Sequence, residues 1–163
     1  MTKAREQSGN IDRFQIFRSD NSNTSVDISG GVVDFTYYES VLSNTISANA
    51  IVVETGMQDS SDIGNRGIID GLPIRGGEQT IIQVSDNQNN NLQFREDSSM
   101  YVNRVRNADP GTQKDVYVLD FSPREFIANE QSRVFRRFDG PISESVRSIL
   151  TESLNVSDDA LDI

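Results

Sequence analysis

Val32-Val33-Asp34-Phe35-Thr36-Tyr37-Tyr38 is followed, after a turn at Ser43-Asn44, by Ile46-Ser47-Ala48-Asn49-Ala50-Ile51-Val52-Val53. Apolar and polar residues alternate in both runs, and a period of two is typical of β-strands. One face of the first run is expected to hold Val33, Phe35 and Tyr37, and one face of the second Ile46, Ala48, Ala50 and Val52. The two runs predict a long antiparallel hairpin, and the alanines indicate that something packs closely against its second strand.

Shorter strand patterns lie on both sides of this hairpin. Strands are expected around Phe14, at residues 80–84, from Leu92, and at residues 100–105. Residues 116–121 are apolar on both faces except for Asp120, which is typical of a central strand. The sequence therefore predicts a mainly β fold, a barrel or sandwich of antiparallel strands.

The hydrophobic period changes after residue 121. Ser122-Pro123-Arg124-Glu125 has the form of a capping box with proline at the first helical position. It predicts a helix whose apolar face carries Phe126, Ile127, Val134 and Phe138. After a break at residues 139–141, a second amphipathic helix is predicted from the spacing of Ile142, Val146, Ile149, Leu150 and Leu154.

One or two C-terminal helices after the strands make the predicted class α+β. We expect a flexible N-terminal arm at 1–11, an antiparallel β domain at 12–121, a helical segment at 122–155 and an acidic tail at 156–163. The length of 163 residues suits one ordinary domain, or one domain with an appendage.

Composition excludes several kinds of chemistry within this sequence, because it contains no Cys, no His and no Trp. Disulfides, zinc sites of the Cys/His kind, and Ser-His-Asp or Cys-His catalysis are all ruled out. Fifteen basic and 25 acidic residues give a formal net charge of −10, which argues against tight binding of nucleic-acid phosphates. The sequence has no apolar run of about 18 residues, so we predict no membrane span.

The charge is uneven along the chain. Residues 21–121 carry six basic and fourteen acidic side chains, a net charge of −8, so the β-rich part is expected to present the acidic surface. Arg133, Arg136 and Arg137 form the one basic cluster, and the pattern places them on adjacent turns of the first helix. They are candidate partner contacts, for phosphates, for a partner's carboxylates or for self-association, although such a run is more often a solvated helix face.

Two polar clusters have ordinary structural explanations. The carboxylates of a central loop region lack the spacing of an EF-hand, so solvated loop carboxylates are favoured over a metal site; these are Asp59, Asp62, Asp70 and Glu78. Gly30-Gly31 and the glycines of residues 71–77 lack the Lys-Ser/Thr that follows in a phosphate-binding loop, so bulges or turns are favoured.

Several charged and aromatic residues within the strand patterns are further candidate sites. For the charged residues Asp34, Arg104 and Asp120, an outward-facing position on the sheet is favoured over a catalytic role. Tyr37-Tyr38 with Phe35 could form a stacking platform for a sugar or a base, and cross-strand packing is the favoured interpretation. We therefore predict no enzyme activity, and no catalytic, cofactor or metal site.

Four stretches occur in an order that resembles the N-terminal part of the baseplate hub proteins of contractile-tailed bacteriophages. They are residues 33–40 leading to 46–50, residues 71–78, residues 116–125, and residues 138–146 continuing to Leu150. The turn Leu72-Pro73-Ile74 before Gly76-Gly77-Glu78, and the helix that begins Ile142-Ser143-Glu144-Ser145-Val146, carry most of the resemblance. It covers about residues 12–155.

The resemblance implies a structural role in the virion. Hub proteins have a tail-tube-like β-barrel domain and form a trimeric ring, which is pseudo-hexameric where each chain holds two such domains. The ring joins the tail tube to the central spike and leaves a channel through which genomic DNA passes without specific binding. The expected location is the tail or baseplate of a virion assembled in the host cytoplasm.

The resemblance also names the expected partners. They are further copies of the chain, the tail tube protein and the central spike, and no membrane is involved. Leu72, Pro73 and Ile74 join the three arginines as candidate partner contacts. An acidic lumen would repel DNA phosphates, so that DNA slides without sticking.

Length leaves two interpretations open, because family hubs are usually more than twice as long and this chain has room for one such barrel. It is either an N-terminal portion of a longer hub, favoured by an end at Leu161-Asp162-Ile163 soon after an amphipathic helix, or a single-domain tube or adaptor protein in six copies. The alternative function is a carbohydrate- or receptor-binding β-domain. That function predicts an exposed aromatic patch, and the low aromatic content without Trp counts against it.

Overall fold

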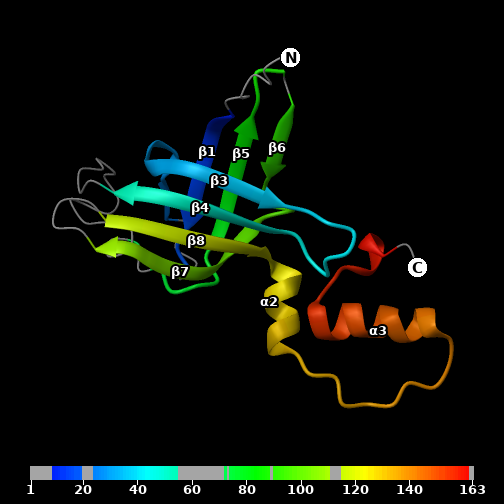
Figure 1. Cartoon of the computed structure of the whole chain (residues 1–163). Helices are drawn as coiled ribbons and strands as arrows, with labels where there is room; N and C mark the ends of the chain where they lie inside the picture. Colours follow the sequence, from blue (N-terminus) through cyan, green and yellow to red (C-terminus); the bar gives the residue numbers. More distant parts are fainter. Residues whose placement is uncertain are drawn as a thin grey trace. The chain divides into compact units, whose positions relative to one another are not determined.

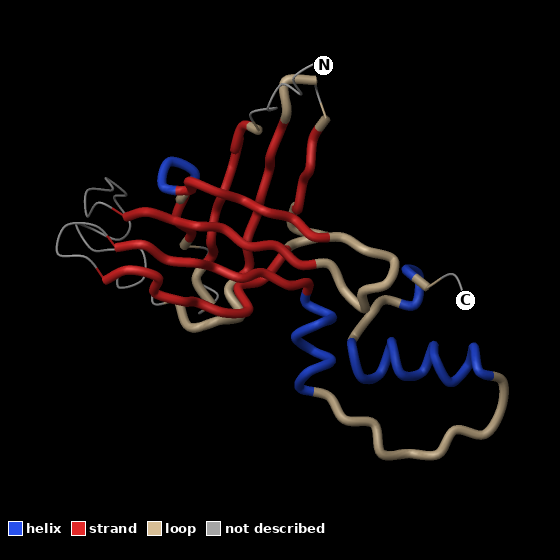
Figure 2. The backbone as a smooth tube through the Cα atoms, viewed as in Figure 1, coloured by secondary structure: helices blue, strands red, loops and turns tan. Residues whose placement is uncertain are grey.

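The computed structural model describes residues 9–19, 24–54, 72, 74–88, 90–110 and 115–161, with the backbone alone at 107–110 and 160. The chain divides into two compact units, Met1–Ser122 and Pro123–Ile163. We call them the strand unit and the helical unit after what each contains (Figures 1 and 2). The predicted class is confirmed: the protein is mainly antiparallel β with two C-terminal α-helices.

One sheet contains all the strands of the described part of the chain. They are β1 (Asn10–Phe17), β2 (Ser25–Asp27), β3 (Val32–Tyr38), β4 (Ser47–Glu54), β5 (Gln79–Ser85), β6 (Asn91–Phe94), β7 (Met100–Pro110) and β8 (Asp115–Pro123). The strand order is β2-β1-β5-β7-β8-β4-β3, and β6 also pairs with β5. Strand β8 therefore has the central position predicted for residues 116–121. The sheet is not closed into a barrel, because β2 and β3 end this order and no ladder joins them among the described residues.

The two ends of the sheet are nevertheless consecutive in the chain. Ile28 and the 3-10 turn η1 (Ser29–Gly31) lead directly from β2 to β3. The Ile28 amide donates to the Phe14 carbonyl at 2.8 Å, and the Phe14 amide donates to Ser29 Oγ at 2.8 Å. In Figure 1, β1, β5 and β6 run steeply across the direction of β3, β4 and β8. The sheet thus folds across itself and encloses its own core.

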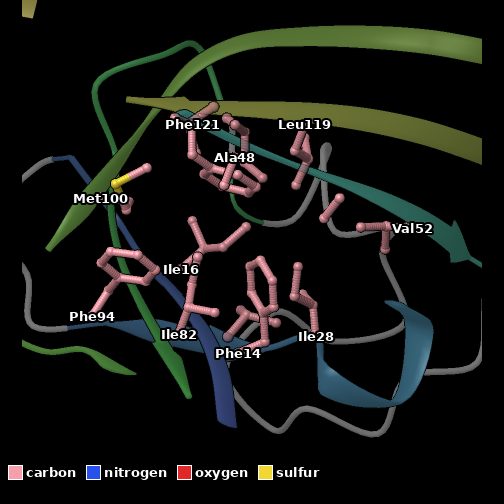
Figure 3. Packing of buried hydrophobic residues seen from close by; sticks show 14 of the residues in the cluster. Phe14, Ile16, Ile28, Ala48, Val52, Ile82, Phe94, Met100, Leu119 and Phe121 are labelled. Atoms are coloured by element: carbon pink, nitrogen blue, oxygen red, sulfur yellow. The ribbon is translucent and has the colours of Figure 1, made fainter. Parts of the chain in front are cut away.

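The core lies between these two crossing parts (Figure 3). Phe14 of β1 packs against Phe35 of β3 and Phe121 of β8, with ring centroids 6.0 and 5.6 Å apart. Strand β4 buries Ala48, Ala50 and Val52, which confirms the predicted inner face. Small side chains there let the aromatic rings of other strands approach closely.

A β-bulge changes the predicted inner face of β3. Val32 pairs with Val52 and Asp34 with Ile51, so Val33 is an extra residue opposite β4. Val32, Phe35 and Tyr37 pack against the core, whereas Val33 is exposed. The prediction that Val33 shares a face with Phe35 was wrong, because the extra residue shifts the alternation by one.

The helical unit contains α2 (Arg124–Gln131), α3 (Ile142–Leu154) and the 3-10 turn η2 (Asp158–Ala160). Asn155 caps the C-terminus of α3; it has a left-handed φ of 53°, and its amide donates to the Leu150 carbonyl. The predicted capping box does not form: α2 begins after Pro123 without a side-chain cap. Ser122 is instead buried at the end of β8, where its hydroxyl accepts a hydrogen bond from Asn103 Nδ2 at 3.2 Å. Neither described α-helix is long and apolar enough to cross a membrane.

Candidate functional site

Strand β3 leaves one of its edges unpaired among the described residues. It ends the strand order and pairs only with β4. An unpaired edge presents backbone N–H and C=O groups to which another strand can add. Strand β2, at the opposite end of the order, has three residues against the seven of β3. Strand β6, which has four residues, also pairs with one strand only, so the β3 edge is the longest of these three among the described residues.

The hairpin between β3 and β4 carries apolar residues at its tip. Val41 and Leu42, which we call the hairpin tip, are fully exposed. The Leu42 amide donates to Ser40 Oγ at 3.2 Å, and the Ser43 amide donates to the Ser40 carbonyl at 3.0 Å. The turn is therefore held by its own polar groups, which leaves the two apolar side chains available to a partner.

A pocket of about 340 Å³ lies at this end of the hairpin. We call it the hairpin pocket, and its lining residues are Tyr37, Tyr38, Glu39, Ser40, Ser43, Thr45 and Ser47. The Tyr37 hydroxyl donates to Glu39 Oε2 at 3.0 Å. Burial, followed by the hydrogen bond and the negative charge of Glu39, raises the pKa of Tyr37. The phenol is therefore a protonated donor at ordinary pH.

The aromatic cluster of β3 is divided between the two faces of the strand. Phe35 and Tyr37 pack inward, and the Tyr37 ring lies 5.5 Å from that of Phe94. The preferred interpretation, cross-strand and core packing, is confirmed for these two residues. Tyr38 is on the other face and is 53% exposed, so a platform made of all three rings does not exist.

A second pocket, of about 380 Å³, lies on the outer side of β1 and β5. Its lining residues are Arg13, Ile81, Gln83, Arg95, Glu96 and Asp97. Both Nε and Nη2 of Arg13 donate to Gln15 Oε1, at 3.0 and 2.5 Å. Two arginines and two carboxylates balance in charge, and the described residues of the lining include no nucleophile with an adjacent base. We assign no activity to it.

The arginine cluster does not lie on a helix, so its predicted arrangement was wrong. Helix α2 ends at Gln131, and Ser132 is extended, with φ −99° and ψ 137°. The Ser132 hydroxyl donates to the Ser153 carbonyl at 3.0 Å, and Arg136 Nη1 donates to Glu152 Oε2 at 2.8 Å. These contacts hold the segment along α3, which outweighs the helical spacing of its apolar residues.

The three arginines therefore have different environments. Arg136 also donates to Ser148 Oγ, and its guanidinium lies 4.7 Å from the Phe138 ring centroid. Arg137 pairs with Asp139 at 2.7 Å. Arg133 is exposed, and its guanidinium has no partner in the described part of the chain. One free arginine, rather than a patch of three, remains for a phosphate or a carboxylate.

The other predicted contact residues belong to the core. Leu72 is 1% exposed and Ile74 is 7% exposed, so both pack inside the strand unit instead of facing a partner. Pro73 lies outside the described residues. The turn at residues 72–74 was predicted from the sequence, but the direction of its apolar side chains was not.

The turn after Ile74 is built around a buried carboxylate. Glu78 is almost fully buried, and its two oxygens accept from the amides of Arg75 and Gly76 at 2.8 and 2.9 Å. The Gly77 amide donates to the Val102 carbonyl at 2.7 Å. Because these amides are used within the fold, the turn is not a phosphate cradle.

The remaining charged candidates have structural partners or lie elsewhere. Asp120 pairs with Arg106 at 2.8 Å rather than with Arg104, and Asp34 accepts from Thr36 Oγ1 at 3.2 Å. Asp59, Asp62 and Asp70 fall outside the described residues. Within the described ranges, no three acidic side chains are grouped to hold a metal ion.

Sequence reasoning missed the hairpin tip. Its signal was present, because two large apolar residues stand immediately before the turn residues Ser43-Asn44. No protein-family model matches the chain, and a comparison with curated proteins found no match.

Proposed function

We propose that the protein is a structural subunit of a bacteriophage tail, a baseplate hub or tail-tube-like component that assembles into a ring. The ring, trimeric or pseudo-hexameric, would join the tail tube protein to the central spike in the virion, after assembly in the host cytoplasm. The observation that carries this proposal is the β3 edge together with the hairpin tip.

Closure of a ring would bury both the β3 edge and the hairpin tip. A strand from a second copy can add to the β3 edge, and repetition around a closed ring leaves no edge exposed. The hairpin tip extends beyond the strands, where Val41 and Leu42 would be buried against a neighbouring copy. Burial of such exposed apolar side chains by a neighbouring copy removes them from water, which favours an interface.

Charge supports the proposed channel for DNA. Residues 21–121 carry a net charge of −8, and a wall of this sign repels phosphates over about 10 Å at an ionic strength of 0.1 M. In a gel-shift experiment with double-stranded DNA, we expect the protein to produce no shifted DNA band at low salt, where any attraction by basic side chains would be strongest.

Light scattering coupled to size-exclusion chromatography tests the assembly. We expect the wild-type chain to form a closed oligomer as concentration rises, with rings visible by negative-stain microscopy. Val33→Lys combined with Leu42→Lys should shift the population to monomer, because it puts charge on the β3 edge and at the hairpin tip. Gln88→Lys, on the exposed turn between β5 and β6, makes the same kind of change elsewhere and should assemble normally.

Two results would contradict the proposal. A wild-type chain that stays monomeric at millimolar concentration would exclude self-assembly by this chain. An oligomer that survives the double substitution unchanged would show that the β3 edge and the hairpin tip are not its interface.

A further inference from the structure

The hairpin pocket contains hydrogen-bond donors and acceptors that have no partner within the described part of the chain. The hydroxyls of Tyr38 and Ser47 make no hydrogen bond within the described part of the chain. Ser40 Oγ accepts from the Leu42 amide, which leaves its O–H free to donate. Glu39 Oε2 accepts from Tyr37, which leaves Oε1 as an open acceptor. Donors and acceptors thus occur together on the pocket wall.

The other two hydroxyls of the pocket are fixed by the turn. Ser43 Oγ donates to the Thr45 carbonyl at 2.8 Å, and Thr45 Oγ1 donates to the Ile46 carbonyl at 3.1 Å. With their protons committed, both oxygens face a ligand as acceptors only. The turn therefore orients part of the polar lining before any ligand arrives.

The charge of the pocket selects against anions. Among the described residues that line the pocket, Glu39 is the only charged one, and none is a Lys or Arg. The chain as a whole has a net charge of −10. Phosphates and carboxylates would meet a negative wall, whereas a neutral molecule with many hydroxyls can both donate to Glu39 and accept from the pocket's hydroxyls.

The exposed ring of Tyr38 adds an apolar surface. It is 53% exposed beside the polar lining, whereas Tyr37 is held against Phe94 and Glu39. An aromatic ring offers a flat face to the C–H groups of a sugar ring, and its hydroxyl serves as a polar tip. The volume of about 340 Å³ is at the low end of small-molecule sites, which suits a mono- or disaccharide.

We propose that the hairpin pocket binds a neutral saccharide, which stacks on Tyr38 and donates a hydroxyl to Glu39. Nucleotides are disfavoured by their phosphates, and adenosine, a base with a sugar and no phosphate, serves as the probe that separates base binding from sugar binding. The proposal does not depend on ring assembly, because every group it uses comes from one hairpin of one chain.

Saturation-transfer NMR with the whole chain tests the proposal, with N-acetyl-D-glucosamine, D-glucose, maltose, D-glucuronate and adenosine as separate probes. At least one neutral sugar should give signals that saturate in the millimolar range. D-glucuronate, which adds a carboxylate to the same ring, should bind at least about tenfold more weakly than D-glucose. That ratio corresponds to about 1.4 kcal/mol.

Variants assign the binding to the pocket. Tyr38→Ala should lower the affinity for the sugar at least about tenfold, and Tyr38→Phe should keep most of that affinity, because it retains the ring. Glu39→Gln should lower the affinity for the neutral sugar and reduce the preference for D-glucose over D-glucuronate. Gln88→Ala, at an exposed residue of the β5–β6 turn that is outside both the pocket and the proposed interface, should leave sugar binding unchanged. Circular dichroism establishes that each variant is folded.

Three outcomes would overturn the proposal. They are the absence of signal for every neutral sugar, full sugar binding by folded Tyr38→Ala and Glu39→Gln, and tighter binding of adenosine than of any sugar. Light scattering on the same samples reports assembly separately, so failure of sugar binding is distinguishable from failure of the ring.

Discussion

The strand unit and the helical unit are stabilised in different ways. In the strand unit, side chains from crossing strands form one buried cluster around Phe14 and Phe121. In the helical unit, neither α2 nor α3 has a buried residue, and Phe135 and Ile142 are 86% and 82% exposed. Hydrophobic burial therefore stabilises the first unit, whereas polar contacts such as Arg136 to Glu152 organise the second.

This difference indicates which unit tolerates change. Burial of an aromatic side chain contributes several times more free energy than an exposed ion pair. We expect the strand unit to unfold as a cooperative block and the helical unit to respond to pH and salt. Substitutions in matched pairs can test this contrast.

The largest effect is expected from Phe14→Ala. This substitution leaves a cavity among Phe35, Phe121 and their neighbours and should lower the free energy of unfolding of the strand unit by about 3–5 kcal/mol. Phe135→Ala, in the helical unit, should change the free energy of unfolding by less than about 0.5 kcal/mol, because that ring is already in water. Urea titrations followed by near-ultraviolet circular dichroism measure both, and equal effects would remove the contrast between the units.

A smaller loss is expected from Glu78→Gln. The amide keeps one oxygen but brings an NH2 group toward a backbone N–H, so one buried donor loses its acceptor at a cost of about 1–3 kcal/mol. Glu96→Gln makes the same chemical change at an exposed position and should be almost neutral. The midpoints of urea unfolding compare the two variants. An unchanged midpoint for Glu78→Gln would mean that the carboxylate does not stabilise the turn.

Gly76→Ala should cost about 1–2 kcal/mol, because Gly76 has a φ of +106°, where L side chains are strained. The nearest atoms to an added Cβ are 3.8 Å away, so the cost is conformational and not steric. Gly30 has open space around it and no positive φ, and Gly30→Ala should be mild. Thermal unfolding compares the two, and equal losses would contradict this account of the turn.

The smallest effect is expected in the helical unit, where Ser148 and then Arg136 lower the pKa of Glu152. The folded unit thus favours the ionised carboxylate, so this stabilisation is present above the ordinary pKa of a glutamate and is lost as pH falls through the lowered value. NMR titration should find the pKa of Glu152 depressed in the wild type and raised toward its ordinary value in Ser148→Ala and Arg136→Gln. An unchanged titration in both variants would show that these contacts do not form in solution.

Strand positions were largely predictable, because burial imposes a period of two on the sequence. The inner face of β4 and the central place of β8 followed directly from alternation and from two-sided apolarity. Val33 was misplaced because a bulge adds one residue, and no residue type in the sequence marks it. The end of α2 was missed because Ser132 and Arg136 find partners on α3, which no local pattern reveals.

The candidate site was predicted only in part. Alternation placed Tyr37 with Phe35 on one face of the strand and Tyr38 on the other, which the structure confirms. The sequence did not show which of the two faces is buried. The directions of Leu72 and Ile74 depend on a turn set by Glu78, whose partners are backbone amides and leave no trace in the sequence. Pockets and exposed tips arise from loop geometry, which alternation does not determine.

The pairing of β1 with β5 has a consequence for the newly made chain. Phe14 pairs with Ile82, 68 positions later in the sequence, and chains grow at about 5–20 residues per second. Strand β1 therefore leaves the ribosome about 3–14 s before β5 exists, and until then it can pair only with the three-residue β2. Strand β3, in contrast, meets β4 almost at once. During that interval the growing chain is most vulnerable to aggregation, and we expect its yield in cells to depend on chaperones that cover β1.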